Sequence, residues 1–332
     1  ESGEGDTRSH LFTNSIINFD TDSFNYSRMK LDLQRTSNDN YLKIYKLDSP
    51  LIKNLGYLTS SLSFEASKED LEIKTAVTVY EDLDKLLTDR YEFVYPSFDI
   101  VKNFNGNLSL NANGHQKLYD TNKSEKILIN DLLYESDPKI LPIGLKNNYQ
   151  FLIKNVNTDA DNTTRYKNNT ENQMLGMFLF ETSYPLKKQN EKSSNFLTPK
   201  ASLRFSPTHT RNIKNEDRRV DINNIYSLNR IGSNDTIEGG QSITIGTEYR
   251  KTDSENNDLF SLNLAKVYRD KINEDLPTKS TIGEKDSDIV GNLKLIPNNN
   301  LNIDYNFSLD NNFDTANFHQ VKSEMIINNF VT

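Results

Sequence analysis

Cysteine and tryptophan are both absent from the sequence. The lack of cysteine excludes disulfide bonds, thiolate metal sites and cysteine nucleophiles. Long apolar runs are absent as well: no stretch approaches the ~18 consecutive apolar residues of a membrane helix, which excludes a helical membrane protein. A membrane-crossing β-strand is apolar only at alternate positions, so the mean hydropathy of −0.71 is compatible with a strand-built membrane protein.

Positive charge is in deficit, with a formal net charge of −8 and a pI near 5.2. A nucleic-acid partner would require a basic face that neutralises phosphates, so we expect no nucleic-acid binding.

Residues 1–10 lack the basic and apolar regions of a signal peptide, and residues 328–332 stop in the middle of a pattern. We therefore expect the sequence to be a fragment of a longer protein.

Strict alternation of apolar and polar residues dominates the chain. In residues 301–310 every odd position is apolar and every even position is polar, which predicts a strand with one apolar and one wet face. The same pattern recurs in segments 29–33, 71–79, 108–112, 201–205, 243–249 and 260–264. Turn-forming clusters separate these segments, which indicates strand after strand.

Three segments, 155–172, 187–195 and 208–219, are polar and rich in charge, and we expect them to be long connections. Helical periodicity is sparse, the best candidate being a short piece around residues 81–87. We interpret the chain as all-β: an antiparallel up-and-down transmembrane β-barrel that is incomplete, comprising about fifteen or more central strands of a very large barrel. All of residues 1–332 are expected to belong to this single barrel domain.

A soluble β-sandwich would also alternate, and it stays open as an alternative. A sandwich of this length would normally contain continuous Val/Ile runs in buried strands. Here small polar and charged residues line one face of almost every strand, and a water-filled lumen explains that pattern directly.

No group of residues has the spacing of a catalytic, cofactor or metal site. The four histidines are scattered, and Asp286-x-Asp288, which places two carboxylates on one face of an extended segment, is more simply a solvated pair. Glu238-Gly239-Gly240 is interpreted as a hairpin turn before a strand that starts at Gln241. We expect no enzymatic activity, no cofactor and no metal.

Four arginines, Arg204, Arg230, Arg250 and Arg269, lie in or near alternating segments. On a wet face their guanidinium groups could donate hydrogen bonds to anionic head groups. They could equally pair with Asp and Glu across the lumen, which is the commoner role.

Three stretches carry a specific resemblance. They are residues 197–207, then Asn229-Arg230-Ile-Gly-Ser-Asn-Asp235 leading to 238–250, and 276–283 with Ser287-Asp288-Ile-Val-Gly291. In this order they resemble the barrel domain of the lipopolysaccharide-assembly (LptD) family, especially its alphaproteobacterial members. The Asn-Arg-x₄-Asp run is the most specific part. The resemblance makes Arg204, Asn229, Arg230, Asp235, Arg250, Arg269 and Asp288 candidate motif or lumen residues.

The resemblance implies a barrel in the outer membrane of a Gram-negative bacterium that receives lipopolysaccharide from periplasmic bridge proteins and inserts it into the outer leaflet. Implied partners are lipopolysaccharide, outer-membrane lipid, an LptE-like lipoprotein plug in the lumen, and the bridge proteins. The bridge docks on a periplasmic N-terminal β-jellyroll, which we expect to be absent here together with the terminal barrel strands. A general porin or substrate-specific outer-membrane channel is the main alternative, ahead of a soluble extracellular β-sandwich.

Overall fold

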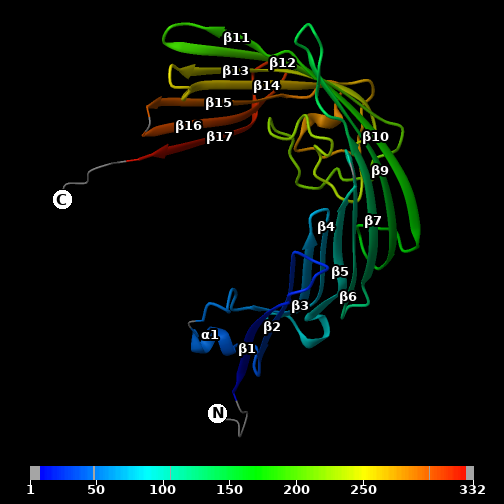
Figure 1. Ribbon diagram of the computed structural model, residues 1–332. Helices are drawn as coiled ribbons and strands as arrows, with labels where there is room; N and C mark the ends of the chain where they lie inside the picture. Colours follow the sequence, from blue (N-terminus) through cyan, green and yellow to red (C-terminus); the bar gives the residue numbers. More distant parts are fainter. Residues whose placement is uncertain (1–7, 48, 105, 299, 327–332) are drawn as a thin grey trace, which may run out of the picture. The chain divides into compact units, whose positions relative to one another are not determined.

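The computed structural model describes residues 8–47, 49–104, 106–298 and 300–326, and almost all of its regular structure is strand (Figure 1). Within these ranges, seventeen strands form one antiparallel sheet, accompanied by one short α-helix and two 3₁₀ helices. In chain order the elements are β1 (His10–Asn18), β2 (Tyr26–Thr36), α1 (Tyr41–Tyr45), β3 (Tyr57–Lys68), β4 (Leu71–Asp82), η1 (Leu87–Asp89), β5 (Tyr91–Asn103), β6 (Leu108–Tyr119), β7 (Ser124–Glu135), β8 (Lys139–Ile140), β9 (Lys146–Asp161), β10 (Glu171–Ser183), β11 (Leu186–Gln189), β12 (Ser193–Ser206), β13 (Gly240–Asp253), β14 (Asp258–Arg269), η2 (Thr281–Gly283), β15 (Ile289–Asn298), β16 (Leu301–Leu309) and β17 (Ala316–Met325).

Each strand position in the sheet pairs with the position that follows it in the chain. Two of these positions are each filled by two strand segments with a break between them. β10 and β11 both pair with β12, and the break between them falls at Pro185, which has no N–H to donate to a ladder. β7 and β8 both pair with β9, and Pro138 lies in that break. The 17 described strands therefore fill 15 places of a simple up-and-down order, and the predicted all-β antiparallel meander is confirmed.

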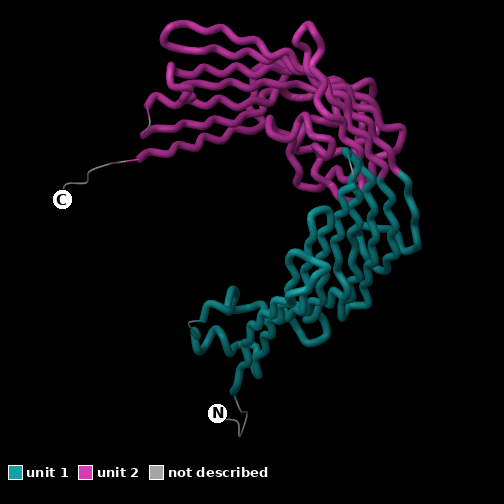
Figure 2. The backbone as a smooth tube through the Cα atoms, viewed as in Figure 1, with its two compact units in different colours: residues 1–133, 154–174 teal, residues 134–153, 175–332 magenta. Residues whose placement is uncertain are grey.

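The chain divides into two compact units, shown in different colours in Figure 2. Unit 1 comprises residues 1–133 and 154–174. Its strands β1 to β6 pair in sequence order, with full registers such as Tyr57↔Asp82 to Lys68↔Leu71 between β3 and β4. A small apolar cluster formed by Tyr41, Leu42, Leu58 and Leu83 packs the β2–β3 connection against strand ends.

The helix expected around residues 81–87 was wrong. Glu81 is held in a ladder between Leu58 and Tyr91, so it extends β4, and only η1 follows. Arg90 next to η1 donates to both carboxylate oxygens of Asp39 at 2.8 and 2.6 Å. These hydrogen bonds hold the pKa of Asp39 below its usual range and fasten the β2–β3 connection.

Unit 2 comprises residues 134–153 and 175–332. Strands β10 and β12 to β17 pair one after another, and two long connections, 207–239 and 270–288, coil together beside them (Figure 1). Backbone bonds join the connections, including Ile213 N–H to Asp275 O at 2.8 Å. Their apolar side chains form a buried core with β14 and β15: Ile213, Val220, Ile225, Ile231, Ala265, Val267, Leu276, Ile282 and Val290.

Of the three expected long connections, one was predicted too long and one was wrong. In 155–172 the strands β9 and β10 reach to Asp161 and from Glu171, leaving only 162–170 as a connection. In 187–195, β11 and β12 pair as a hairpin. Residues 187–195 are polar on both faces, so polarity alone did not distinguish a wet hairpin from a loop. The third, 208–219, does lie in a long connection, but that connection is packed rather than solvated.

Successive connections alternate in length with one exception, since 120–123 is as short as its neighbours. The connections that follow every second strand position of the sheet are 37–56, 83–90, 120–123, 162–170, 207–239, 270–288 and 310–315. Those leaving the intervening places are all short: 19–25, 69–70, 104–107, 141–145, 190–192, 254–257 and 299–300. Because neighbouring strands are antiparallel, each series leaves strands of one direction. Long connections on one side and tight turns on the other are typical of outer-membrane β-barrels.

Candidate functional site

The two faces of strands β12 and β13 have the opposite polarity to those of a soluble sheet. Leu203 and Ile243, cross-strand neighbours, are 44% and 46% exposed. Arg204 and Ser242, one position along on the same strands, are 2% and 4% exposed. Apolar side chains outside and polar side chains inside indicate that the outer face is matched to an apolar surrounding.

Strand register brings three polar residues together on the inner face. Arg204 on β12 lies opposite Ser242 on β13, and Ser242 lies opposite Arg269 on β14. The connection 207–239 then places Arg230 and Glu238 over this row. We call Glu238, Arg204, Arg230 and Arg269 the arginine–glutamate cluster.

Glu238 is the common acceptor of this cluster. Its Oε2 accepts from Arg230 Nε at 2.6 Å and from Arg204 Nη1 at 2.9 Å. Its Oε1 accepts from Arg230 Nη2 at 2.5 Å and from Arg269 Nη1. Arg230 also donates to Ser242 Oγ at 2.9 Å and Thr244 Oγ1 at 3.0 Å, which ties the connection to β13.

The cluster is fully enclosed and its charges do not cancel. Glu238 is 2% exposed, and each of the three arginine side chains is at most 2% exposed. Burial alone would raise the pKa of Glu238, but Arg230, Arg204 and Arg269 together hold it below the usual range of a glutamate. Glu238 is therefore a carboxylate, and it is the single counter-charge that makes the burial of three cations tolerable.

The interpretation of Glu238-Gly239-Gly240 as a hairpin turn was wrong. The residues end a long connection, and the first strand residue is Gly240, whose φ of +92° favours glycine. Gly239 is required for another reason: a Cβ there would lie 2.2 Å from the carbonyl oxygen of Thr208. The two glycines allow the Glu238 side chain to lie inside the cluster although β13 begins only two residues later.

Asn229 and Asp235 stabilise the same connection. Asn229 donates to the carbonyl of Ser233 at 2.8 Å, closing the turn that carries Arg230. Asp235 is 3% exposed and accepts from Ser233 Oγ at 2.8 Å and Arg211 at 3.0 Å. The residues of the Asn-Arg-x₄-Asp run thus stabilise a single turn of the connection.

The other two candidate residues lie elsewhere. Asp288 accepts from Ser308 Oγ at 2.9 Å and Asn317 Nδ2 at 2.7 Å, joining the start of β15 to β16 and β17. Arg250 lies towards the far end of β13, with its guanidinium 4.8 Å from the ring centroid of Phe196. Asp286 does not share Asp288's surroundings, since it is exposed whereas Asp288 is buried.

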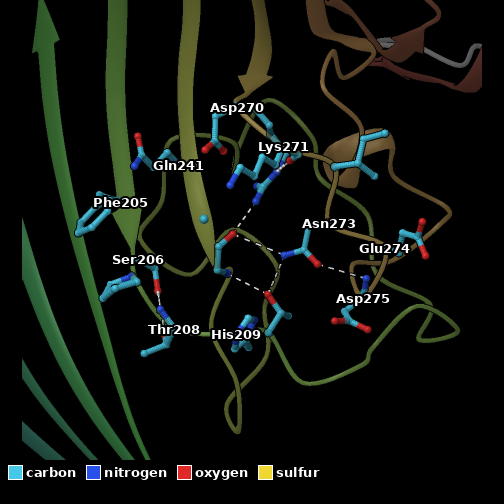
Figure 3. A pocket seen from close by; sticks show the side chains of 16 residues that line it. Phe205, Ser206, Thr208, His209, Gln241, Asp270, Lys271, Asn273, Glu274 and Asp275 are labelled. Carbon is cyan, nitrogen blue, oxygen red and sulfur yellow. Dashed lines mark hydrogen bonds between the residues drawn. The ribbon is translucent and has the colours of Figure 1, made fainter.

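A pocket of about 460 Å³, which we call the rim pocket, adjoins the cluster at the ends of β12, β13 and β14 and is lined by both polar and apolar residues (Figure 3). Gln241, Asp270 and Lys271 lie along one side of it, and Ser206, Thr208 and His209 along another. Its floor is fixed, because Gly239 N–H donates to Thr210 Oγ1 at 2.9 Å and its carbonyl accepts from Arg269 at 2.5 Å. Asn273 Nδ2 donates to the same Thr210 oxygen at 3.0 Å.

These features define a class: an antiparallel meander with an apolar outer face, a polar inner face and a packed interior connection, as in strand-built outer-membrane proteins. Within the described ranges no helix is long and apolar enough to cross a membrane, and no cluster of metal-ligating side chains occurs. A family model described as "LptD: LPS transport system D" matches residues 142–324. The chain belongs to this family, whose members transport and assemble lipopolysaccharide at the outer membrane. No match is found among curated proteins.

Proposed function

We propose that this chain forms part of the wall of an outer-membrane β-barrel that passes lipopolysaccharide from the periplasm to the outer leaflet. The observation that carries the proposal is the inverted polarity of β12 and β13 around a packed interior connection, in a chain of the LptD family. The exposed apolar residues match the hydrocarbon of the bilayer, and the polar inner face hydrates phosphate and sugar groups that are costly to desolvate.

The alternation of connection lengths supports an orientation. In outer-membrane barrels the short turns face the periplasm and the long loops face the exterior. The connections 207–239 and 270–288 would then enter from the cell surface, and turns such as 254–257 would face the periplasm. All residues 1–332 would belong to one barrel domain, with the bridge-docking β-jellyroll and further strands supplied by other parts of the protein.

The arginine–glutamate cluster has a structural role in this proposal. Arg204 and Arg269 belong to the wall, whereas Arg230 and Glu238 belong to the connection, so their ion pairs fasten the connection inside the sheet. Asn229 and Asp235 shape the connection, and Asp288 fastens β15 to its neighbours. Lipopolysaccharide would then pass over the remaining polar inner surface, with an LptE-like lipoprotein in the lumen and bridge proteins on the periplasmic side. No bond is made or broken.

Depletion of the full-length protein in its own bacterium tests this function. We expect newly made lipopolysaccharide to accumulate inside the cell and to escape modification by outer-leaflet enzymes. A porin predicts the reverse: normal surface lipopolysaccharide with reduced uptake of small hydrophilic solutes. That second outcome would contradict the proposal.

A further inference from the structure

The rim pocket lies directly beyond the apolar outer face of unit 2. The outward row Leu203, Ile243 and Tyr268 crosses β12, β13 and β14 in register, each side chain 42% to 46% exposed. The next outward row is formed by Phe205, Gln241 and Asp270. Phe205 lies opposite Gln241, and Asp270 N–H donates to the Gln241 carbonyl at 3.3 Å.

Polarity therefore changes within one step of the strand pleat. Two residues along a strand cover about 7 Å, and over that distance the outward surface changes from three large apolar side chains to an aromatic ring, an amide and a carboxylate. A surface with this abrupt change fits an amphipathic molecule. Its apolar part would lie against Leu203, Ile243 and Tyr268, and its polar part would enter the pocket.

The polar groups of the pocket are available for a ligand. Across the described residues, the side chains of Gln241, Asp270, Lys271 and Glu274 make no hydrogen bond or ion pair with the protein, and Figure 3 places all four around the pocket. They present both donors and acceptors. The floor beneath them is held by Arg269 and Thr210, so the pocket is largely preformed.

The charge of the pocket discriminates between head groups. Asp270, Glu274 and Asp275 are acidic, and Arg269 is already paired with Glu238, which leaves Lys271 as the available cation on these lining residues. A phosphodiester head group carries a negative charge, so it would face three carboxylates. A sugar ring offers hydroxyls that both donate and accept, and 460 Å³ is large enough to hold it.

We propose that this pocket and the adjoining apolar row form a binding site for a glycolipid on the outer surface of the sheet, with acyl chains on Leu203, Ile243 and Tyr268 and a sugar head group against Gln241, Asp270 and Glu274. Lys271 takes an anionic substituent where the sugar carries one. The site is separate from the inner polar face, and it rests on the proposed function in one respect: the outer face of unit 2 must face lipid.

Lipid binding to the folded full-length protein tests the site. The protein in detergent is titrated with glucosyl diacylglycerol and phosphatidylglycerol that carry identical acyl chains, and bound lipid is counted by native mass spectrometry. We expect the glycolipid to bind at least tenfold more tightly than phosphatidylglycerol. The double variant Gln241→Ala/Asp270→Ala should abolish this preference, whereas Lys251→Ala, at the far end of β13, should preserve it.

Equal binding of the two lipids, or a preference for phosphatidylglycerol, would overturn the glycolipid site, and so would an unchanged preference in the double variant. The comparison of lipids on the unaltered protein does not depend on the folding of any variant. Failure of the unaltered protein to insert into bilayers would instead contradict the proposed function. The two failures are therefore distinguishable.

Discussion

Replacing Glu238 by glutamine should destabilise unit 2 strongly. Glu238 accepts four hydrogen bonds from three arginines, and all four side chains are buried. The amide of glutamine keeps the volume but removes the only negative charge of the cluster. Removing one partner of a buried ion pair costs about 3–5 kcal/mol, because the remaining charge stays buried without compensation. We expect the free energy of unfolding to fall by that amount.

Urea unfolding of the full-length protein in lipid vesicles measures this change, with the loss of heat-modifiable migration on gels as the readout. Glu248→Gln is the matched control. Glu248 is 39% exposed at its side chain and pairs with Lys200 at 2.7 Å, and such a surface pair contributes only about 0–1 kcal/mol. If the two variants shifted the unfolding midpoint equally, the reasoning about the cluster would be refuted.

Three further predictions concern pH, register and orientation. Folding lowers the pKa of Glu238, so its stabilising contribution is complete above about pH 4.5, the range of an unfolded glutamate, and is lost as the pH falls towards the folded pKa. Acid unfolding should therefore depend less on pH in Glu238→Gln than in the unaltered protein. Identical pH profiles of the two proteins would argue against this role of Glu238. A nitroxide at Tyr305 should be relaxed by oxygen in lipid and one at Asn306 by a water-soluble nickel chelate, and the reverse would show that the faces of β16 are misassigned. A single cysteine at Asn215 should react with an impermeant maleimide in intact cells, while one at Glu255 should react only after the outer membrane is permeabilised; labelling of Glu255 alone would invert the orientation.

The strands could be predicted from the sequence because alternation is a local signal. Segments 29–33, 71–79 and 301–309 all fall within strands β2, β4 and β16, and the polar positions of β16 do share a network, in which Asn292 donates to Asp304 at 3.0 Å and Asn306 at 2.9 Å. The break at Pro185 is likewise visible in the sequence.

The packed connection could not be predicted in the same way. Its charged residues suggested a solvated loop, and the spaced isoleucines Ile213, Ile225, Ile231 and Ile237 were the signal that it has a core. Arg204, Arg230 and Arg269 were identified as candidates, but Glu238 was not, because its role depends on a register between β12, β13 and β14 that no local pattern specifies. Pairing with acidic groups, one of the two roles considered for these arginines, is the one observed.

The same register gives the cluster a consequence for assembly in the membrane. The four side chains come from β12, the connection, and β14, so they meet only after three strands have paired in the correct alignment. A slip of one residue would turn Arg204 or Arg269 to the lipid face, where a cation costs up to about 2–4 kcal/mol at the bilayer midplane and less near the interfaces. It would also leave Glu238 buried without its partners. A misaligned pairing of these strands therefore costs free energy in two ways. The cluster thus favours the correct strand register while the barrel wall assembles.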